Sequence, residues 1–499
     1  MPKHEKFIKY RHALGALSCL YFGFIYPVVG YAQSKEQGIK TPTNAETITG
    51  ISGKMEIHPK SEEKTLLGSV YDYLHTQGQN LIDTGIYPKA FFASTYYGNA
   101  VGGITRQDIG YNEAFYGADF DMEKLAGWDG GIIRIALDSR FGGQPSGVNN
   151  LTGSTVTFFH GSGPNNTTRL NQLVIEQHLL DDRLRFTVGR TQLASFFATS
   201  QLYCMFMIGM CSNLNPITWS SNSNSPFWPI SVWGGEVTFI PTENTYVRIG
   251  AEESNVAQYT KGGFPWHNGW GIDTATGAYT AAEVGYEYPG WEEGYNGRYD
   301  IGFYNDTSDV DDFQYTANGQ KLAFTHGTPR RYSLQNGLYL QFEQKIWAPK
   351  KNGPQGTTLF GGMVFDTSGH SLQQNYFLLG AVQYGTFPGR DDDYFAMKVA
   401  SHTFNGRAIG YLNDSLIVNK QGGQISRTEQ VMEVDYSVEC MDGVRLQPFV
   451  AMVFHPDQLV YNLPSPKRDV TFSFSGGVQL SIVLAQAIGL PGFGLGRPY

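Results

Sequence analysis

Charged residues are scarce in this sequence. They make up 16% of the 499 residues, whereas soluble domains usually carry about 25%. Glycine (60 residues) and aromatic residues (14%) take their place. Glycine disfavours helix interiors, while tyrosine and phenylalanine suit pleated strands. The composition therefore favours an all-β protein over a helical one.

Long hydrophobic runs are absent after residue 32. Any membrane role of the mature chain must therefore come from strands. The start of the chain has a basic segment at 3–11, an apolar stretch at 13–29 and small residues at 30–32, which is typical of an export signal. We predict cleavage after Ala32. A transmembrane anchor is the alternative, but Pro27 and Gly30 interrupt the run.

Basic residues are also too few for a nucleic-acid partner. The formal net charge is -9, and residues 1–32 contain four basic residues and one acidic residue, so cleavage would take it to about -12. An acidic chain without a basic stripe cannot neutralise phosphates. We expect an exported acidic protein that binds no nucleic acid.

Cysteine is rare. In an oxidising compartment Cys204 and Cys211 could pair across a short loop, which would leave Cys440 over. No spacing typical of a metal site occurs. We predict no metal and no cofactor.

Catalytic motifs are missing as well. We find no Gly-x-Ser-x-Gly elbow, no His-Glu-x-x-His helix and no phosphate-binding loop. Two carboxylate pairs, Glu283/Glu287 and Glu433/Asp435, could serve a glycosidase. Each lies in a regular polar register beside further charges, so a solvated face is the simpler interpretation. We predict no catalytic residue.

What the sequence does contain is a series of β-rich segments separated by Gly, Asn, Asp and Pro clusters. About sixteen can be marked, with no helices between them, and this even number is typical of bacterial barrels. The segments lie near 84–97, 109–123, 131–140, 169–180, 183–193, 232–241, 244–254, 277–289, 296–306, 333–347, 357–367, 373–385, 394–405, 427–440, 443–454 and 469–484.

Several of these segments alternate apolar and polar residues. In 131–140, Ile133, Ile135 and Leu137 share one face, and Arg134, Asp138 and Arg140 share the other. A soluble β-sandwich would bury the apolar set, and no single strand excludes that alternative. Sixteen strands would, however, leave a sandwich with exposed edges, whereas closure in lipid satisfies every backbone group.

The connections alternate in length, which also favours a membrane barrel. Tight turns at Asp181-Asp182 and Met441-Asp442 contrast with long polar stretches at 142–168, 194–231 and 255–276. We therefore predict an all-β, transmembrane antiparallel β-barrel of about 16 strands, with short periplasmic turns and long extracellular loops.

The chain divides into four parts on this interpretation. Residues 1–32 are the signal peptide, and 33–82 form a periplasmic N-terminal segment with a short amphipathic helix at 66–82. The barrel spans 83–485, and a C-terminal tail spans 486–499.

The order of several motifs resembles a known family. LLGSVYDYLHTQG (66–78), DFDMEKLAGWDG (119–130), RLNQLVIEQHLLDDRLRFTVGR (169–190) and FPGRDDDYFAMKVA (387–400) are similar to motifs of the carbohydrate-selective outer-membrane porins of the OprB family. The chain departs from the family pattern at 69–71, at 454–466 and after Leu484. The resemblance implies a sixteen-stranded channel through which sugars diffuse passively.

A sugar channel needs hydrogen-bonding side chains along its lumen. The polar register of the strands supplies candidates of both signs, so we expect weak charge selectivity and a preference for neutral polar solutes. Any one of them could instead pair with a neighbour to stiffen the wall. Arg134, Arg248 and Glu343 are the clearest, because each lies mid-strand between apolar neighbours. The predicted pore-lining residues are Glu113, Arg134, Asp138, Glu176, Arg185, Arg248, Asp300, Glu343, Lys345, Lys398 and Glu433.

Other singled-out residues have simpler explanations. Arg190 falls in the apolar register, so it would lie beyond a bulge at Gly189 or at the rim. Tryptophans at segment ends fit an interfacial girdle better than sugar stacking. The tract 387–393 lacks the ligand spacing of a calcium loop and predicts a capped turn. The tryptophans are Trp128, Trp233, Trp291 and Trp347.

The sequence thus predicts a porin in the outer membrane of a Gram-negative bacterium, with lipid, carbohydrates and small polar solutes as partners. Monomer and homotrimer stay open. The alternatives are an adhesin or enzyme on the same barrel, and a secreted soluble all-β sugar-binding protein.

Overall fold

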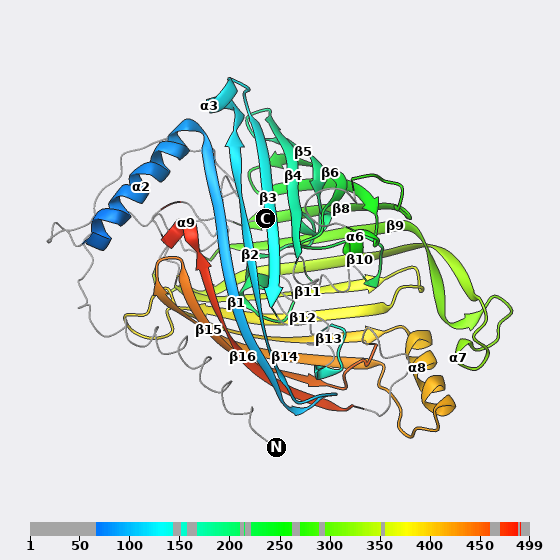
Figure 1. The fold of residues 1–499 in the computed structure, drawn as a ribbon. Helices are drawn as coiled ribbons and strands as arrows, with labels where there is room; N and C mark the ends of the chain where they lie inside the picture. Colours follow the sequence, from blue (N-terminus) through cyan, green and yellow to red (C-terminus); the bar gives the residue numbers. More distant parts are fainter. Residues whose placement is uncertain are drawn as a thin grey trace, which may run out of the picture.

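The computed structural model describes residues 66–142, 151–156, 167–209, 214, 221–261, 270–288, 295–350, 355–459, 470–487 and 490. These residues form a closed barrel of sixteen strands, in which each strand pairs antiparallel with its neighbours in sequence. The last strand, β16, pairs with the first, β1, from Phe91 opposite Val483 to Gly102 opposite Ser473. The barrel prediction is confirmed (Figure 1).

All sixteen predicted segments correspond to strands. Their bounds are β1 (Ile86–Gly102), β2 (Asp108–Asp121), β3 (Gly131–Gly142), β4 (Thr167–Leu179), β5 (Leu184–Thr191), β6 (Val232–Thr242), β7 (Thr245–Ser254), β8 (Gly277–Tyr288), β9 (Gly297–Thr316), β10 (Pro329–Trp347), β11 (Gly356–Asp366), β12 (Gln373–Tyr384), β13 (Tyr394–Phe404), β14 (Thr428–Met441), β15 (Val444–Phe454) and β16 (Phe472–Val483).

The two registers of the strands face two environments. The apolar register lies outside, where Ile249, Ile301 and Leu379 are each more than half exposed. The polar register lies inside, where side chains such as Glu433 and Ser473 are fully buried. An apolar outer wall around a polar interior is the pattern of a membrane barrel and the reverse of a soluble sandwich.

The connections fall on two rims of different character. All the long stretches predicted as loops leave from one end, which we call the long-loop rim; the opposite end is the short-turn rim. At the short-turn rim, Asp181 and Asp182 adopt positive φ angles, and the β14–β15 turn uses Gly443 at φ 71°. Glycine suits that turn because it adopts positive φ without steric cost.

Helices occupy both ends of the barrel. The expected helix at 66–82 is α2 (Leu66–Thr84), which lies at the short-turn rim near α9 (Leu484–Ala487) and α3 (Met122–Ala126) (Figure 1). At the other end lie α6 (Gln258–Lys261), α7 (Leu322–Thr325) and α8 (Gly406–Val418). None of the described helices is long and apolar enough to cross a membrane.

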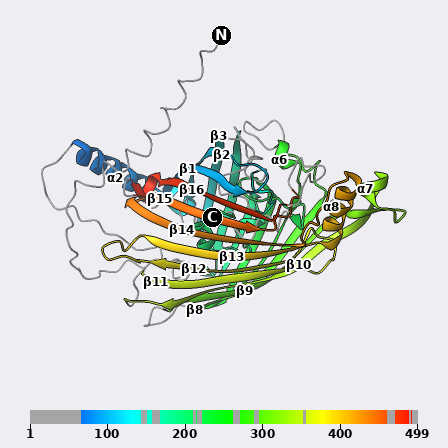
Figure 2. The ribbon, with the colours of Figure 1, turned by 90° about the horizontal axis from the view of Figure 1, so that it is seen from below.

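The prediction of no helices between the strands is wrong: α3, α6, α7 and α8 all lie between strands, and α8 is the longest of these four. Asn405 caps this helix by accepting a hydrogen bond from the Arg407 amide, and its apolar face buries Ile409, Leu412 and Leu416. The helix packs on an extension of β9 and β10 that projects past the other strands (Figure 2). We call this extension, α7 and α8 together the outer cap.

Candidate pore and its constriction

The connection between β5 and β6 folds into the barrel. It contains two short 3-10 helices, η1 (Leu193–Ser195) and η2 (Gln201–Met205). Leu193, Phe197 and Phe206 are almost completely buried. We call its described residues from 192 to 231 the inner loop. Because it occupies the lumen, it narrows the path through the barrel.

Carboxylates on the wall accept backbone N–H groups of the inner loop. Glu252 on β7 accepts from the Leu193 amide at 2.6 Å, and Glu283 on β8 accepts from the Ala198 amide at 2.7 Å. Glu283 also accepts the hydroxyls of Tyr246 and Tyr339, each at 2.8 Å. These bonds satisfy loop amides that no secondary structure would pair.

Carbonyls of the same loop receive wall donors. Arg298 on β9 and Gln341 on β10 both donate to the Thr199 carbonyl, at 2.6 and 3.0 Å. Gln341 in turn accepts from the Tyr203 hydroxyl at 2.8 Å. Arg248 on β7 donates to the Phe196 carbonyl. Donors and acceptors therefore fix the first half of the loop along β7 to β10.

Glu433 on β14 is the far anchor. Its Oε1 accepts from the amides of Met207 at 2.6 Å and Ile208 at 2.9 Å. Lys398 on β13 pairs with Glu433 at 3.0 Å and also donates to the Ile208 carbonyl. A charge-assisted hydrogen bond is stronger than a neutral one, so this cluster holds the loop firmly against the wall.

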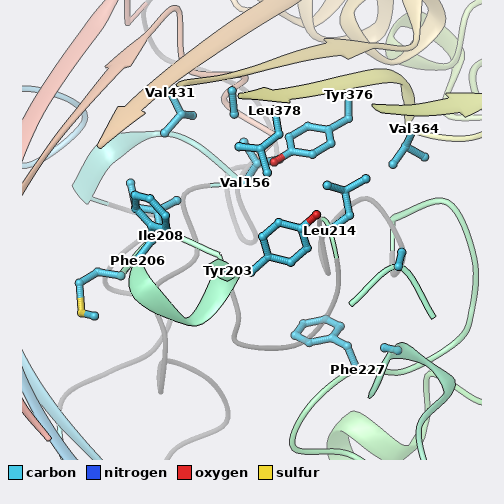
Figure 3. Close-up of a cluster of buried hydrophobic side chains, with 14 of the residues drawn as sticks. Val156, Tyr203, Phe206, Ile208, Leu214, Phe227, Val364, Tyr376, Leu378 and Val431 are labelled. Carbon is cyan, nitrogen blue, oxygen red and sulfur yellow. The ribbon is translucent and has the colours of Figure 1, made fainter. Parts of the chain in front are cut away.

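Apolar packing supports the polar anchors. Figure 3 shows Tyr203, Phe206 and Leu214 of the loop among the wall side chains Tyr376 and Leu378. The ring centroids of Phe206 and Phe360 lie 5.6 Å apart. A pocket enclosing about 480 Å³ of empty space, part of it open to solvent, lies between the loop and β11 to β14.

Beyond these anchors, the loop contacts two further parts of the wall, on β12 and on β2. Asn222 exchanges hydrogen bonds with the backbone of Gln373 on β12, and the Trp228 indole donates to Glu113 on β2 at 3.1 Å. Trp228 also packs on Phe115 with ring centroids 4.9 Å apart. The inner loop thus touches strands around much of the circumference.

A second piece of chain enters from the long-loop rim, at residues 151–156. Ser154 donates to Glu429 on β14 at 2.7 Å, and both the amide and hydroxyl of Thr155 donate to Asp457 at 2.8 Å. Burial raises the pKa of Asp457, although the Thr155 hydrogen bonds act to lower it. This segment narrows the mouth on the side of β14 and β15.

A chain of ion pairs crosses β1 to β4. Lys89 Nζ lies 2.5 Å from Asp119 Oδ1, and Asp119 Oδ2 lies 2.6 Å from Arg134 Nη1. Arg134 Nε continues to Glu176 Oε2 at 2.8 Å. Glu176 then bonds to His178 at 2.6 Å. We call this series the charge ladder. Lysine, aspartate, arginine and glutamate alternate in charge along the ladder, so it presents dipoles rather than a net charge.

The eleven predicted residues all lie in the inward register of their strands, and the structure brings them into three groups. Glu113, Arg248, Lys398 and Glu433 hold the inner loop. Arg134 and Glu176 belong to the charge ladder. The remaining ones lie on the wall, where Asp138 pairs with Arg140 at 3.2 Å, and Glu343 lies 4.0 Å from Arg298 and shares it with Asp300. Arg185 and Lys345 complete the set, on β5 and β10.

The structure also tests the predictions for Arg190 and for the tract 387–393. Gly189 and Arg190 pair in register with both β4 and β6, so there is no bulge at Gly189. Arg190 lies near the long-loop end of β5, where its guanidinium packs on the rings of Trp233 and Trp270. The tract 387–393 is a turn in which Arg390 donates two hydrogen bonds, of 2.6 and 2.8 Å, to the Asp393 carboxylate.

The interpretation of the pairs Glu283/Glu287 and Glu433/Asp435 as a solvated face is wrong for three of these four carboxylates. Glu283, Glu433 and Asp435 are at most 1% exposed. The error arises because the alternation identifies a polar face without showing that a loop covers it.

The predictions for the tryptophans and cysteines concern residues at the two rims and in the inner loop. Trp128 and Trp347 are exposed at the short-turn rim and Trp233 at the opposite rim, an arrangement that suits a girdle; Trp291 lies outside the described residues. Cys204 forms a disulfide, while the proposed partner Cys211 also lies outside the described part of the chain.

Sequence reasoning missed some of the residues that shape the lumen. Lys89 is the sole charged residue of β1, and Asp119 shares the register of Glu113, so strand alternation alone could have found both. Glu252 shares the register of Arg248 in the same way. The loop residues carry no periodic signal.

A wall of inward polar residues narrowed by an internal loop is the architecture of a diffusion channel. Residues 106–476 match the model of the carbohydrate-selective porins of the OprB family. The chain belongs to this family. It is therefore a porin, and the prediction made from its motifs is confirmed.

Individual porins agree with this assignment. Porin B of Pseudomonas aeruginosa is 24% identical over 406 residues, which cover 75% of this chain and 84% of that protein. A putative porin named QuiX from Acinetobacter baylyi is 22% identical and covers 70% of this chain and 82% of its own length.

Solved structures show the same fold. The high-pH structure of Pseudomonas putida OprB is 21% identical and superposes with a TM-score of 0.71, covering 85% of this chain and 99% of that one. The low-pH structure of the same porin gives a TM-score of 0.50. The family assignment and the fold therefore support passive diffusion of carbohydrates.

Proposed function

We propose that the mature porin begins after Ala32 and resides in the outer membrane of a Gram-negative bacterium. The support is the apolar outer register, together with exposed tryptophans at both rims. Acyl chains would cover the outer wall, and the indole rings would lie at headgroup level. The long-loop rim would face outward and the short-turn rim would face the periplasm. The oligomeric state, monomer or homotrimer, stays open.

Neutral sugars and small polar solutes are the proposed cargo. The observation that carries this is the pairing of lumen charges: the charge ladder and the Arg298–Asp300 pair at 2.6 Å place opposite charges side by side. Such pairs offer donors and acceptors to hydroxyl groups without holding a counter-ion strongly. Passage of this kind requires no catalytic group, cofactor or metal.

Liposome swelling with neutral sugars and with charged solutes of similar size tests this proposal. Neutral sugars should enter faster than into empty liposomes, and charged solutes should enter more slowly than neutral ones. Entry no faster than into empty liposomes would overturn the channel, and faster entry of one charged class would overturn the preference for neutral cargo.

A pair of variants on β3 tests the lining role. Arg134→Gln removes a cation from the ladder and should shift the reversal potential in a salt gradient toward cation selectivity. Ile135→Ala changes the adjacent outward residue, which is 37% exposed, and should leave the potential unchanged. Equal potentials in the two variants would remove Arg134 from the solute path.

A further inference from the structure

Helix α2 carries three faces of different character. One face meets the barrel: among the residues of α2 whose burial is described, Tyr71, His75, Gly78, Gln79 and Ile82 are the least exposed. Gly78 marks the closest approach, because a Cβ there would lie 2.2 Å from a methyl carbon of Leu490. The helix is thus held at the short-turn rim by the residues that follow β16.

The second face is an apolar stripe that the protein leaves open. Val70, Tyr73, Leu74 and Leu81 share one helical face, which also carries the exposed polar side chain of Gln77. Tyr73 is 63% exposed and Val70 49%. Four large apolar side chains along one stripe form a patch, which usually marks an interaction surface.

The third face is polar. Its exposed residues advance around the helix by the same spacing, about a third of a turn from the stripe and a third from the docked face. They are Ser69, Asp72, Thr76, Asn80 and Asp83. A helix divided into three such sectors is suited to three environments at once: protein, an apolar medium and water.

We propose that α2 is an interfacial helix, whose apolar stripe lies in the lipid of the leaflet next to the short-turn rim while its polar face remains in water. This inference rests on the membrane location proposed above. The helix lies on the membrane rather than through it, since its other two faces are docked or polar.

The position of α2 favours lipid over other occupants. Gly78 of α2 contacts Leu490, which follows α9, and a Cβ at Gly443 in the β14–β15 turn would lie 2.8 Å from the Ala487 amide nitrogen of α9, so the helix lies beside that turn. Met441 at that turn and Leu484 after β16 are outward-facing and about half exposed. The stripe therefore continues the apolar outer wall at the short-turn rim. The exposed Tyr73 in this stripe suits the headgroup level of a membrane.

Nitroxide labels in the mature porin, reconstituted in phospholipid vesicles, test the proposal. Single cysteines are introduced at Leu74 in the stripe, at Thr76 on the polar face, and at Leu379 on the outer wall, each in a Cys440→Ser background. Collision with oxygen, which concentrates in lipid, is compared with collision with a water-soluble nickel chelate. The Leu74 label should resemble the Leu379 label, and the Thr76 label should favour nickel.

The outcomes separate the inference from the proposed membrane location. If the Leu379 label favours oxygen but the Leu74 label behaves like Thr76, the interfacial helix is wrong and the barrel stays in lipid. If the Leu379 label favours nickel, the membrane location itself fails. A Leu74 label shielded from both reagents would overturn the proposal in favour of another protein surface. Dipolar broadening at high protein-to-lipid ratio would then indicate a second copy, and its absence the porin's own residues before Leu66.

Discussion

Glu433 shows how much of the constriction depends on one side chain. Its carboxylate accepts two inner-loop amides and pairs with Lys398, all without exposure to solvent. Removing one partner of a buried ion pair leaves the other uncompensated, at a cost of about 3–5 kcal/mol. We expect Glu433→Ala to release the loop, raise single-channel conductance and lower the unfolding temperature.

A matched variant on the same strand separates loop release from general damage. Glu439→Ala removes a partly exposed pair with Arg445 near the short-turn rim, away from the loop anchor. Its conductance should stay at the parental value. Unchanged conductance in Glu433→Ala would show that the other polar anchors and the apolar contacts hold the loop without Glu433.

The turn that Asp393 closes should respond to acid. Burial acts to raise the pKa of Asp393, but hydrogen bonds from Arg390, the Glu439 amide and Tyr436 outweigh it and bring the pKa below its ordinary value. A lowered carboxyl pKa contributes stability that is present above the unfolded value, about 3.9, and is lost as the pH falls through the folded value.

Amide exchange measures that dependence. Corrected for intrinsic rates, protection of residues 385–393 should be constant at neutral pH and fall only below about pH 4. Asp393→Asn should show low protection at every pH. Equal acid sensitivity in this variant and the parent would place the titrating group elsewhere.

At the scale of elements, the outer cap depends on polar contacts between α8 and the β9–β10 extension. Asp414 accepts from Lys321 at 2.6 Å and from Gln314 at 2.8 Å, and Arg407 bonds to Asp312 at 2.8 Å. Losing hydrogen bonds to a buried charge costs about 1–3 kcal/mol. Asp414→Ala should therefore loosen α8 and make residues 405–427 sensitive to protease.

The exposed Asp309 provides the control for the cap. Its pair with Arg331, at 3.8 Å, lies mostly in solvent, where ion pairs contribute little. Asp309→Ala should leave proteolysis unchanged, and the barrel should unfold at the parental temperature in both variants. Loss of barrel stability in Asp414→Ala would mean that the cap and the barrel unfold together.

The strands were predictable from sequence because a wall between lipid and water imposes a strict period of two. Ile133 and Ile135 are apolar because they face outward, and Arg134 between them is polar because it faces the lumen. The extension of β9 past residue 306 was not predictable, since DTSDVDDFQYT is polar on both faces and pairs outside the barrel. The helix α8 was missed because its apolar residues pack on that extension, a partner distant in sequence.

The sequence predicts which residues face the lumen, but it does not predict which of them hold the inner loop. Alternation alone placed Glu113, Arg248 and Glu433 inside the barrel. Their task of holding the inner loop depends on contacts with Trp228, Phe196 and Met207, which lie in an aperiodic stretch. No local pattern specifies which wall residue such a loop meets, because that choice follows from the closed tertiary structure.

At the scale of the whole molecule, closure depends on the seam between β1 and β16. Gly477 on β16 faces the Tyr96 carbonyl, and a Cβ at Gly477 would lie 2.2 Å from that oxygen. Backbone cannot yield as a flexible side chain does, and overpacking costs about 1–3 kcal/mol. Gly477→Val should reduce the yield of folded, heat-modifiable barrel on denaturing gels.

Gly98 on the facing strand offers the comparison. It pairs with Gly476 at the same seam, but the atom nearest to a Cβ there lies 3.6 Å away. Gly98→Ala should therefore assemble like the parent. Normal assembly of Gly477→Val would mean that the seam can shift its strands without loss.

The anchors of the inner loop also set an order of events during biogenesis. Met205 is held by Gln447, a residue 242 positions further along the chain, and Met207 by Glu433. Those partners exist as a surface only when β13 to β15 have joined the cylinder. The part of the loop around Met205 and Met207 can therefore reach its final position only after β13 to β15 have joined, so the finished aperture that discriminates between solutes forms late in the maturation of the nascent porin.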